Sequence, residues 1–370
     1  MRFARQLHRR ARLVQSAIPL NKGGGAEGVG VVLAAGTLLK TSDQRTPSML
    51  DRRRFVQQIG TALIGAQWFE GRALAKEGTP GLSGPLRLGG PIFVKTEDPD
   101  ELAAAHQKLG YRAAYCPKVD LDDSTRVRAI AAAFSKRDLV IAEVGRWVNL
   151  LDADVEKRAA NLKLVTDGLA LADEIGALGC VDIAGSFNDK IWYGPHPDNL
   201  SQRMFDAAVE NARKIIDAVK PKRAGFSYEM MGWTLPDSAD SCLKMLKAVD
   251  RPAFAVHMDP CNLVNSPGRF YRNADLLNEC FDKLGRWIVS CHAKDLTWDV
   301  EMNVHFREVR PGAGSMDYTT YLRRLAALPQ KPPLMLEHLP NSEEYDKARL
   351  HLFDLGKKIQ VSFGELSVGG

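Results

Sequence analysis

The chain has 370 residues, which is long enough to bury one large α/β core or two smaller ones. Its formal charge is +5, from 50 Lys and Arg against 45 Asp and Glu. The basic excess lies wholly within residues 1–75, and acidic residues outnumber basic ones in the remainder. A nucleic-acid partner is therefore not expected, because phosphate binding needs a basic footprint on the folded domain.

Residues 49–75 resemble a twin-arginine export signal. The sequence RRRF is followed by the modest apolar stretch QQIGTALIGAQWF and by an A-x-A sequence before Lys76. Asp51 stands where Ser or Thr is commoner, and the alternative interpretation is a surface amphipathic helix of a cytoplasmic protein. We expect export to the periplasm, with a cytoplasmic location as the alternative. The positions of the signal pattern are occupied by Arg52, Arg53 and Phe55.

The segments on either side of this signal are expected to be unstructured. Residues 1–48 are interpreted as a disordered extension upstream of the true start at Met49, and residues 76–89 as a linker. No apolar run reaches the roughly 20 residues that span a bilayer, so no stable membrane anchor is expected. The six cysteines are widely spaced and form no CxxC pair, which argues against a zinc knuckle or a thioredoxin-like site.

From residue 90 onward, short apolar runs alternate with helical patterns, the last of which covers residues 318–328. No GxGxxG follows the first run, which argues against an open dinucleotide-binding sheet. We therefore predict the α/β class and a (β/α)8 TIM barrel, as a single domain over residues 90–360, followed by a tail over residues 361–370. The predicted strands lie at residues 91–93, 112–116, 139–145, 178–185, 224–231, 253–259, 287–295 and 333–339.

The last four predicted strands each end in a side chain that can bind a metal ion. In a (β/α)8 barrel the carboxyl ends of all strands face one mouth, so these side chains are expected to converge there. Taken singly, such a Glu could instead be a helix cap or an ion-pair partner, and such a His a core residue. Three carboxylates with one imidazole suit Mn²⁺, with Mg²⁺, Co²⁺ or Zn²⁺ as alternatives. The four predicted ligands of one divalent ion are Glu229, Asp259, His292 and Glu337.

Six motifs of the chain occur together in one known family. They are IAGSFNDKIWYGPHPDNL, FSYEMMGWTLPDSADS, VHMDPCNLVNSP, VSCHAKDL, REVRPGAGSMDY and PLMLEHL. Through them, the stretch from residue 90 to residue 350 resembles the sugar phosphate isomerase/epimerase family, the xylose isomerase-like barrels that include ketose 3-epimerases. The resemblance implies one divalent ion on the four residues named above, and an acid/base role for Glu229 and Glu337. Many members have His three residues after the metal-binding Asp, whereas this chain has Asn262 there, a departure that concerns the substrate contacts.

Further side chains are expected at the mouth as substrate contacts. His257 lies two residues before Asp259 and therefore on the same side of its strand. A Trp there could stack on a sugar ring, although Trp in a loop is as often local packing. Pro311–Gly314 are interpreted as a turn rather than a phosphate cup. The predicted substrate-binding residues are Glu143, Trp147, His196, Trp233, His257, Asn262, Lys294 and Arg310, and the same segments contain Asn149, Asp295, His305 and Arg307.

These residues predict an enzyme, a divalent-metal-dependent sugar isomerase or epimerase. One glutamate would remove the proton beside a carbonyl, the metal ion would stabilise the enediolate, and the second glutamate would return a proton. The expected partner is a small sugar or keto-sugar, without phosphate if the protein is exported, and a homo-oligomer is left open. A lyase or dehydratase acting on an inosose-like or 3-keto-glycoside substrate would use the same site. An apurinic-site endonuclease, which needs a His-rich cluster of several metals, and a sugar-binding module without catalysis are disfavoured.

Overall fold

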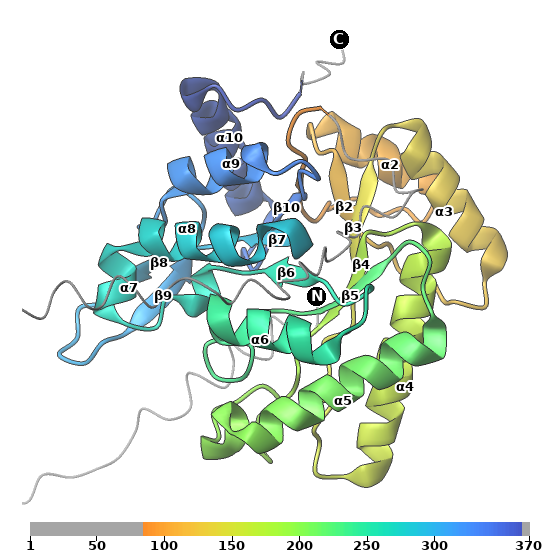
Figure 1. Cartoon of the computed structure of the whole chain (residues 1–370). Coiled ribbons are helices and arrows are strands. Elements are labelled where there is room, and N and C mark those ends of the chain that lie inside the picture. Colours follow the sequence, from red (N-terminus) through yellow and green to blue (C-terminus); the bar gives the residue numbers. More distant parts are fainter. Residues whose placement is uncertain (1–83, 365–370) are drawn as a thin grey trace, which may run out of the picture. The chain divides into compact units, whose positions relative to one another are not determined.

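Eight short parallel strands form a barrel at the centre of residues 84–364, the part of the chain that the computed structural model describes (Figure 1). Their hydrogen-bonded order is β5-β4-β3-β2-β1-β10-β7-β6. Two isolated bridges, Phe226 with Phe254 and Glu229 with His257, join β5 to β6 and nearly close the ring. The predicted (β/α)8 barrel is thereby confirmed. The strands are β1 (Leu88–Gly89), β2 (Ala113–Tyr115), β3 (Val140–Gly145), β4 (Gly179–Asp182), β5 (Gly225–Tyr228), β6 (Val256–Met258), β7 (Ile288–Ala293) and β10 (Leu334–Leu336).

Helices surround the barrel and cover its outer face (Figure 1). Polar side chains start them by accepting hydrogen bonds from the first free backbone N–H groups, as Asp98 does for α2, Asp154 for α4 and Asn341 for α10. Their apolar sides pack on the strands to form the main core. The helices are α2 (Pro99–Lys108), α3 (Ser124–Lys136), α4 (Val155–Ile175), α5 (Gln202–Val219), α6 (Ala239–Val249), α7 (Pro267–Tyr271), α8 (Asn273–Leu284), α9 (Tyr318–Ala327) and α10 (Ser342–Ile359).

The first strand is β1, so the prediction of a strand at residues 91–93 is wrong. Phe93 of that apolar run is exposed, whereas Leu88 is fully buried. Burial between two neighbouring strands, β2 and β10, decides which of the two runs pairs. β1 consequently lies within residues 76–89, which were expected to be a linker, and the barrel begins before residue 90.

The first residues of the expected tail, residues 361–370, also pack on the barrel. Phe363 is buried, and its ring centroid lies 5.4 Å from that of Phe353 in α10. The backbone N–H of Leu86 donates to the carbonyl oxygen of Ser362 at 2.8 Å. The two ends of the described chain therefore lie side by side and belong to the folded barrel.

The strand predicted over residues 287–295 is confirmed as β7, but it ends at Ala293, and a further strand begins at Asp295. After β7 the chain turns, and β8 (Asp295–Trp298) pairs antiparallel with β9 (Phe306–Val309) as a separate hairpin. The carboxylate of Asp295 anchors the return of this hairpin. It accepts hydrogen bonds of 2.8 to 3.1 Å from the backbone N–H groups of Leu296, Gly312, Gly314 and Met316. Pro311–Gly314 thus form a turn around a buried carboxylate.

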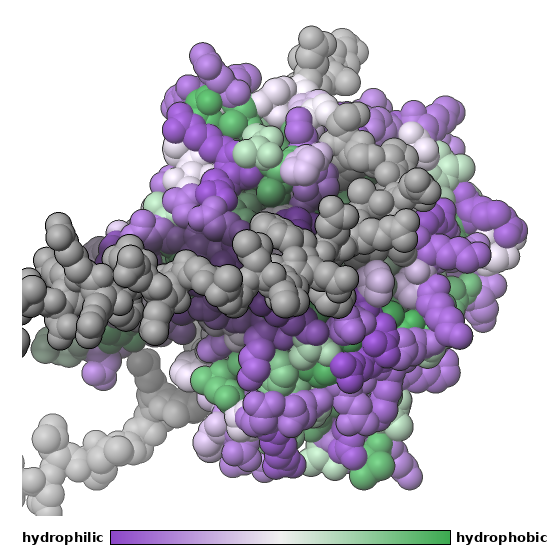
Figure 2. Space-filling model, viewed as in Figure 1, coloured by the Kyte–Doolittle hydropathy of each residue, from purple (hydrophilic) through white to green (hydrophobic). Residues whose placement is uncertain are grey.

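The face of the molecule in Figure 2 is mostly hydrophilic, with apolar side chains in small separate patches. Of the helices within residues 84–364, none combines the length and the apolar character needed to cross a membrane. The predicted extension at residues 1–48 and the predicted signal at residues 49–75 lie outside the described residues.

Candidate metal centre and active site

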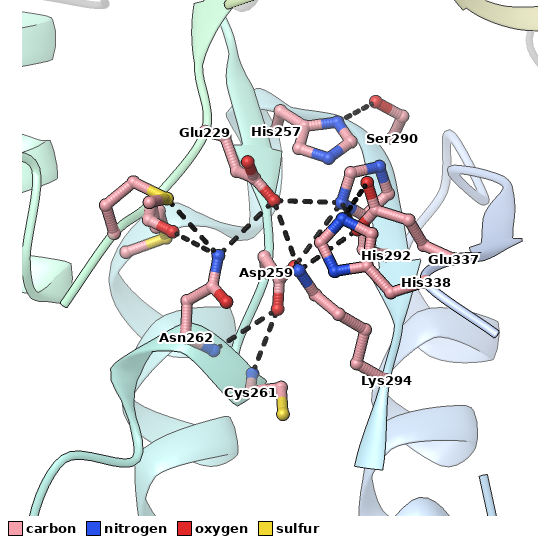
Figure 3. Close-up of polar contacts among 12 residues, drawn as sticks. Glu229, His257, Asp259, Cys261, Asn262, Ser290, His292, Lys294, Glu337 and His338 are labelled. Atoms are coloured by element: carbon pink, nitrogen blue, oxygen red, sulfur yellow. Dashed lines mark hydrogen bonds and ion pairs between the residues drawn. The ribbon is translucent and has the colours of Figure 1, made fainter. Parts of the chain in front are cut away.

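Four side chains converge at the carboxyl ends of β5, β6, β7 and β10 (Figure 3). The Nδ1 atom of His292 lies 3.0 Å from Glu229 Oε1, 3.3 Å from Asp259 Oδ2 and 2.9 Å from Glu337 Oε2. One donor atom from each of the four residues lies within 4.8 Å of the other three. The residues that the sequence predicts as metal ligands are therefore brought together in one cluster.

Asp259 is held by the turn that follows its strand. Its Oδ1 accepts hydrogen bonds from the backbone N–H groups of Cys261 at 3.1 Å and Asn262 at 3.3 Å, in the 3₁₀ turn η2 (Cys261–Leu263). Its Oδ2 is left to face the cluster. The side-chain amide of Asn262 donates to Glu229 Oε1 at 3.3 Å and to the carbonyl oxygen of Met230 at 3.1 Å. Asn262, predicted as a substrate contact, thus orients one of the cluster carboxylates.

Lys294 places a buried ammonium group among the carboxylates. Its Nζ lies 2.7 Å from Asp259 Oδ2, 3.0 Å from Glu337 Oε2 and 3.7 Å from Glu229 Oε1. Burial disfavours the charged form, but the three carboxylates outweigh it and hold the pKa of Lys294 well above its usual value. The cluster of acidic groups therefore already attracts a cation, which is the property that a divalent metal site requires.

The two glutamates of the cluster differ in their protonation. Burial raises the pKa of Glu229 to about 7, because the charged form loses its hydration. Burial acts in the same direction on Glu337, but the positive charges of His292 and Lys294 outweigh it and hold the pKa of Glu337 well below its usual value. The same cations lower the pKa of Asp259 against its burial. The site therefore keeps two carboxylates ionised beside one that takes up a proton near neutral pH.

Glu143 and His257 form a second layer of side chains, which contacts the His292 ring. Glu143, in β3, has Oε1 3.4 Å from His292 Nε2 and Oε2 3.2 Å from His257 Nδ1. His257 Nδ1 is also 2.6 Å from the hydroxyl of Ser290, and burial lowers the pKa of His257 to about 4. When Glu143 accepts the Nε2 proton of His292, the lone pair of Nδ1 is left for the cluster. The donor atoms of Glu143, His257 and His292 also lie within 4.8 Å of one another.

Three other predicted substrate contacts, Trp147, His196 and Trp233, lie in loops. Trp147 is half exposed, with its ring centroid 6.3 Å from that of His292. His196 accepts a hydrogen bond from the backbone of Asp198 and thereby starts a local turn. Trp233 is exposed, and its carbonyl oxygen accepts a hydrogen bond from Asn199. Trp147 is therefore close to the cluster, whereas the contacts found for His196 and Trp233 belong to their own loops.

Two residues at the site escaped the sequence analysis. His338 follows Glu337 with a left-handed φ of 58°, and its Nε2 lies 3.3 Å from Glu337 Oε1. Asp182 closes β4 and is fully buried; burial raises its pKa well above the usual value, and the nearby Glu229 adds to the shift. Both residues end or follow an apolar strand, so the rule that finds the four cluster residues would also have indicated them.

Comparison with known proteins places the chain among similar barrels. A sequence profile described as Xylose isomerase-like TIM barrel matches residues 102–355. A xylose isomerase domain protein from Planctomyces limnophilus has a TM-score of 0.55 at 18% identity, over 75% of this chain and 99% of that one. The 3-keto-D-glucoside 4-epimerase of E. coli has a TM-score of 0.53 at 14% identity, over 74% of this chain and 99% of that one. D-psicose 3-epimerase, solved in the presence of D-fructose, has a TM-score of 0.54 at 12% identity, over 74% of this chain and 100% of that one.

Similar solved structures also include a protein from Bacillus anthracis described as a 3-DHS dehydratase and endonuclease IV from Thermus thermophilus, at 16% and 15% identity. No curated protein matches the chain. Identities this low establish a common fold and not a common activity. The profile match covers well over half of the sequence, and the chain therefore belongs to the xylose isomerase-like TIM barrel family.

Proposed function

We propose that the protein is a divalent-metal-dependent sugar isomerase or epimerase. The observation that carries this proposal is the convergence of Glu229, Asp259, His292 and Glu337, with one donor atom of each within 4.8 Å of the others. Epimerases are among the solved structures with the same fold. A buried cluster that combines acid/base carboxylates with metal-binding groups suits proton transfer beside a carbonyl.

The donor set fits a divalent ion. Three carboxylates and one imidazole favour a hard or intermediate cation, and we propose Mn²⁺, with Mg²⁺, Co²⁺ or Zn²⁺ as alternatives. The contact of the Lys294 ammonium with three of these carboxylates supports the affinity of the cluster for positive charge. A bound divalent ion would polarise the substrate carbonyl and stabilise the negative charge that develops on its oxygen.

The side chains of the chain divide the remaining tasks. One of Glu229 and Glu337 removes the proton from the carbon beside the carbonyl, and the other returns a proton. Return to the opposite face of the same carbon gives an epimer, and return to the neighbouring carbon gives an isomer. Glu143 fixes the orientation of His292 through Nε2, and the ring of Trp147, whose centroid lies 6.3 Å from that of His292, would limit access of water.

The proposal is tested by deuterium uptake. We expect the Mn²⁺-loaded protein to exchange one carbon-bound hydrogen of a ketose or keto-glycoside in D₂O, as measured by NMR and mass spectrometry of the recovered sugar. Glu229→Gln and Glu337→Gln should each abolish the exchange. Glu343→Gln is the matched control, because Glu343 is an exposed glutamate on α10 that pairs with Lys347. Full exchange in both site variants would refute the acid/base assignment.

A second candidate is a lyase or dehydratase that uses the same centre. The observation that favours it is the dehydratase description of one structure with the same fold. Proton removal beside the carbonyl would then be followed by loss of a leaving group from the next carbon. The mass of the product separates the two reactions, because isomerisation and epimerisation conserve it.

We also propose that the protein is exported by the twin-arginine route, with a cytoplasmic location as the alternative. The support is the sequence pattern of residues 49–75 alone. Amino-terminal sequencing of the protein from fractionated cells is the test. A periplasmic form that begins at Lys76 is the expected result, and a form that retains Arg52 and Arg53 in the cytoplasm would exclude export.

A further inference from the structure

A cavity of 280 Å³ lies beside the metal centre rather than around it. Its walls come from β9, from the turn that follows β9, and from the segment between β10 and α10. Lys294 and Glu337 line it and connect it to the centre. Of the described residues, the lining includes neither Glu229 nor Asp259 nor His292. A substrate group that reacts between Glu229 and Glu337 would thus leave this cavity free for another part of the molecule.

The charged groups in the cavity wall are matched in sign. Arg310 Nε lies 3.2 Å from Glu344 Oε2, and His338 Nδ1 lies 3.0 Å from Glu308 Oε2. Lys294 pairs with Glu337 as described above. Arg307 also lines the cavity, and its Nε lies 3.0 Å from Oδ1 of Asp299, which is not a lining residue. Each cation of the wall thus already has a carboxylate partner, whereas an anionic ligand would also meet Glu308 and Glu344, so the wall favours a ligand without charge.

These paired groups retain capacity for further hydrogen bonds. The guanidinium of Arg310 uses Nε for its ion pair with Glu344, and its Nη1 makes only a long contact of 3.5 Å with the carbonyl oxygen of Pro311. Its other N–H groups are therefore available to a ligand. The carboxylates of Glu308 and Glu344 likewise have lone pairs beyond those used in their ion pairs. Short apolar side chains, Val309 and Ala313 among them, lie between the polar groups. Donors, acceptors and small apolar surfaces in one wall match a pyranose, whose hydroxyls both donate and accept and whose C–H faces are apolar.

We propose that this cavity is a subsite for a neutral pyranose unit, and that the substrate is a glycoside or disaccharide whose reacting ring lies at the metal centre. The assignment of the reacting ring rests on the proposed function, whereas the subsite itself rests on the cavity. The unit in the subsite adds binding energy at a distance from the reacting carbon, and such energy can be used to orient the substrate.

The first test of the subsite is the binding of sugars to the metal-free protein, because this measurement does not depend on catalysis. The probes are cellobiose, maltose and trehalose as neutral disaccharides, glucose as the single ring and glucuronic acid as the anion, measured by calorimetry and saturation-transfer NMR. We expect at least one disaccharide to bind about tenfold more tightly than glucose, and glucuronic acid to bind no better than glucose. The proposal is overturned if no disaccharide exceeds glucose or if glucuronic acid is the tightest ligand.

Variants then locate the binding. Arg310→Gln and Glu344→Gln should each weaken the disaccharide by about tenfold, since each removes hydrogen-bonding capacity from the wall. Arg323→Gln, an exposed arginine on α9, is the control and should leave the affinity within about twofold. Because the two wall variants also break an ion pair, Ala313→Trp provides a second route: it fills the cavity and leaves the pair intact. Unchanged disaccharide affinity in Ala313→Trp would overturn the assignment.

Deuterium exchange distinguishes the failure of this inference from the failure of the proposed function. If disaccharides bind in the cavity but no sugar exchanges hydrogen, the subsite stands and the isomerase proposal fails. If free ketoses exchange as fast as their glycosides, with equal kcat/KM, the isomerase proposal stands and the subsite fails. The expected result is a kcat/KM for the glycoside about tenfold above that for the free sugar, and a smaller ratio in Arg310→Gln.

Discussion

The metal cluster and the buried ionisable groups outside it are held in opposite ways. Around β5, β6, β7 and β10, the carboxylates of Asp259 and Glu337 stay ionised because the cations of His292 and Lys294 lie within 2.7 to 3.3 Å. This cluster is a network of matched charges. Removing one member leaves its partners buried and unmatched, which is the costly change in such networks.

Two buried groups outside the cluster, Asp182 at the end of β4 and His106 in α2, stay neutral, although the backbone N–H of Glu229 donates to the carbonyl oxygen of Asp182 at 2.8 Å. Burial raises the pKa of Asp182 well above its usual value and lowers the pKa of His106 to about 4. The ring of His106 packs against the aromatic rings of Tyr111 and Phe134 instead of against a charge. In these examples from residues 84–364, a buried group keeps its charge where an opposite charge is in contact, and the cluster is therefore the place where a metal ion would bind.

The largest effect is expected when the same substitution is made in the cluster and at Asp182 outside it. Asp259→Asn removes a charged oxygen from the cluster, and we expect divalent-ion affinity, measured by calorimetry, to fall by more than about 1,000-fold. Asp182→Asn replaces a neutral carboxylic acid by a neutral amide and should change the affinity by less than about threefold, with about 1 kcal/mol or less lost in stability. Equal losses in the two variants would show that Asp182 also carries charge at the site.

The buried neutral histidine His106 predicts a pH effect on stability. The folded protein holds His106 with a pKa of about 4, below its ordinary value of 6.5, so the unfolded chain binds the proton more readily between these values. The stability due to neutral His106 is complete above pH 6.5 and is lost as the pH falls towards 4. Relative to His106→Leu, the wild type should lose about 3 kcal/mol between pH 7 and pH 4 in urea unfolding.

The control for this measurement is His305→Leu, because His305 is an exposed histidine in the β8–β9 hairpin. The pH dependence of this control should follow that of the wild type. A parallel pH dependence of His106→Leu and wild type would show that His106 already binds its proton in the folded protein.

Glu143→Gln tests the contact between Glu143 in the second layer and His292 in the metal cluster. The amide can no longer serve as a charged acceptor for Nε2–H, so the tautomer that presents Nδ1 is favoured less. We expect divalent-ion affinity to fall by about 10- to 100-fold while the protein stays folded. Retained affinity together with weaker sugar binding would instead support the predicted role of Glu143 as a substrate contact.

The smallest expected change in divalent-ion affinity concerns Lys294→Met, which removes the resident cation and keeps the length of the side chain. The metal-free protein should unfold at lower urea concentration, because the carboxylates lose a contact of 2.7 Å with the ammonium. Divalent-ion affinity should rise by about tenfold, because the ion no longer competes with this positive charge. Weaker metal binding would show that Lys294 supports the loaded site instead of competing with the ion.

Much of the fold and of the candidate site could be predicted because both depend on local patterns. Apolar runs that stop at a polar residue indicate barrel strands and their mouth, and this rule found Glu229, Asp259, His292 and Glu337 together. The local patterns missed β1, because two residues are too few to form a pattern. They also missed α10, which lies beyond the last helical pattern, at residues 318–328. The rule also placed the end of β7 two residues too late, at Asp295, because Lys294 alone separates β7 from β8.

The sequence by itself determined the strand-helix alternation, the barrel and the chemistry of the four cluster residues, since each of these follows from residues close together in the chain. Tertiary structure decided which groups face one another. Glu143 and His292 are 149 residues apart, and only barrel closure brings them into contact. The position of Lys294 among the carboxylates, the contact of His338 with Glu337 and the cavity beside them arise in the same way. Such contacts depend on the packing of distant segments, which no local pattern specifies.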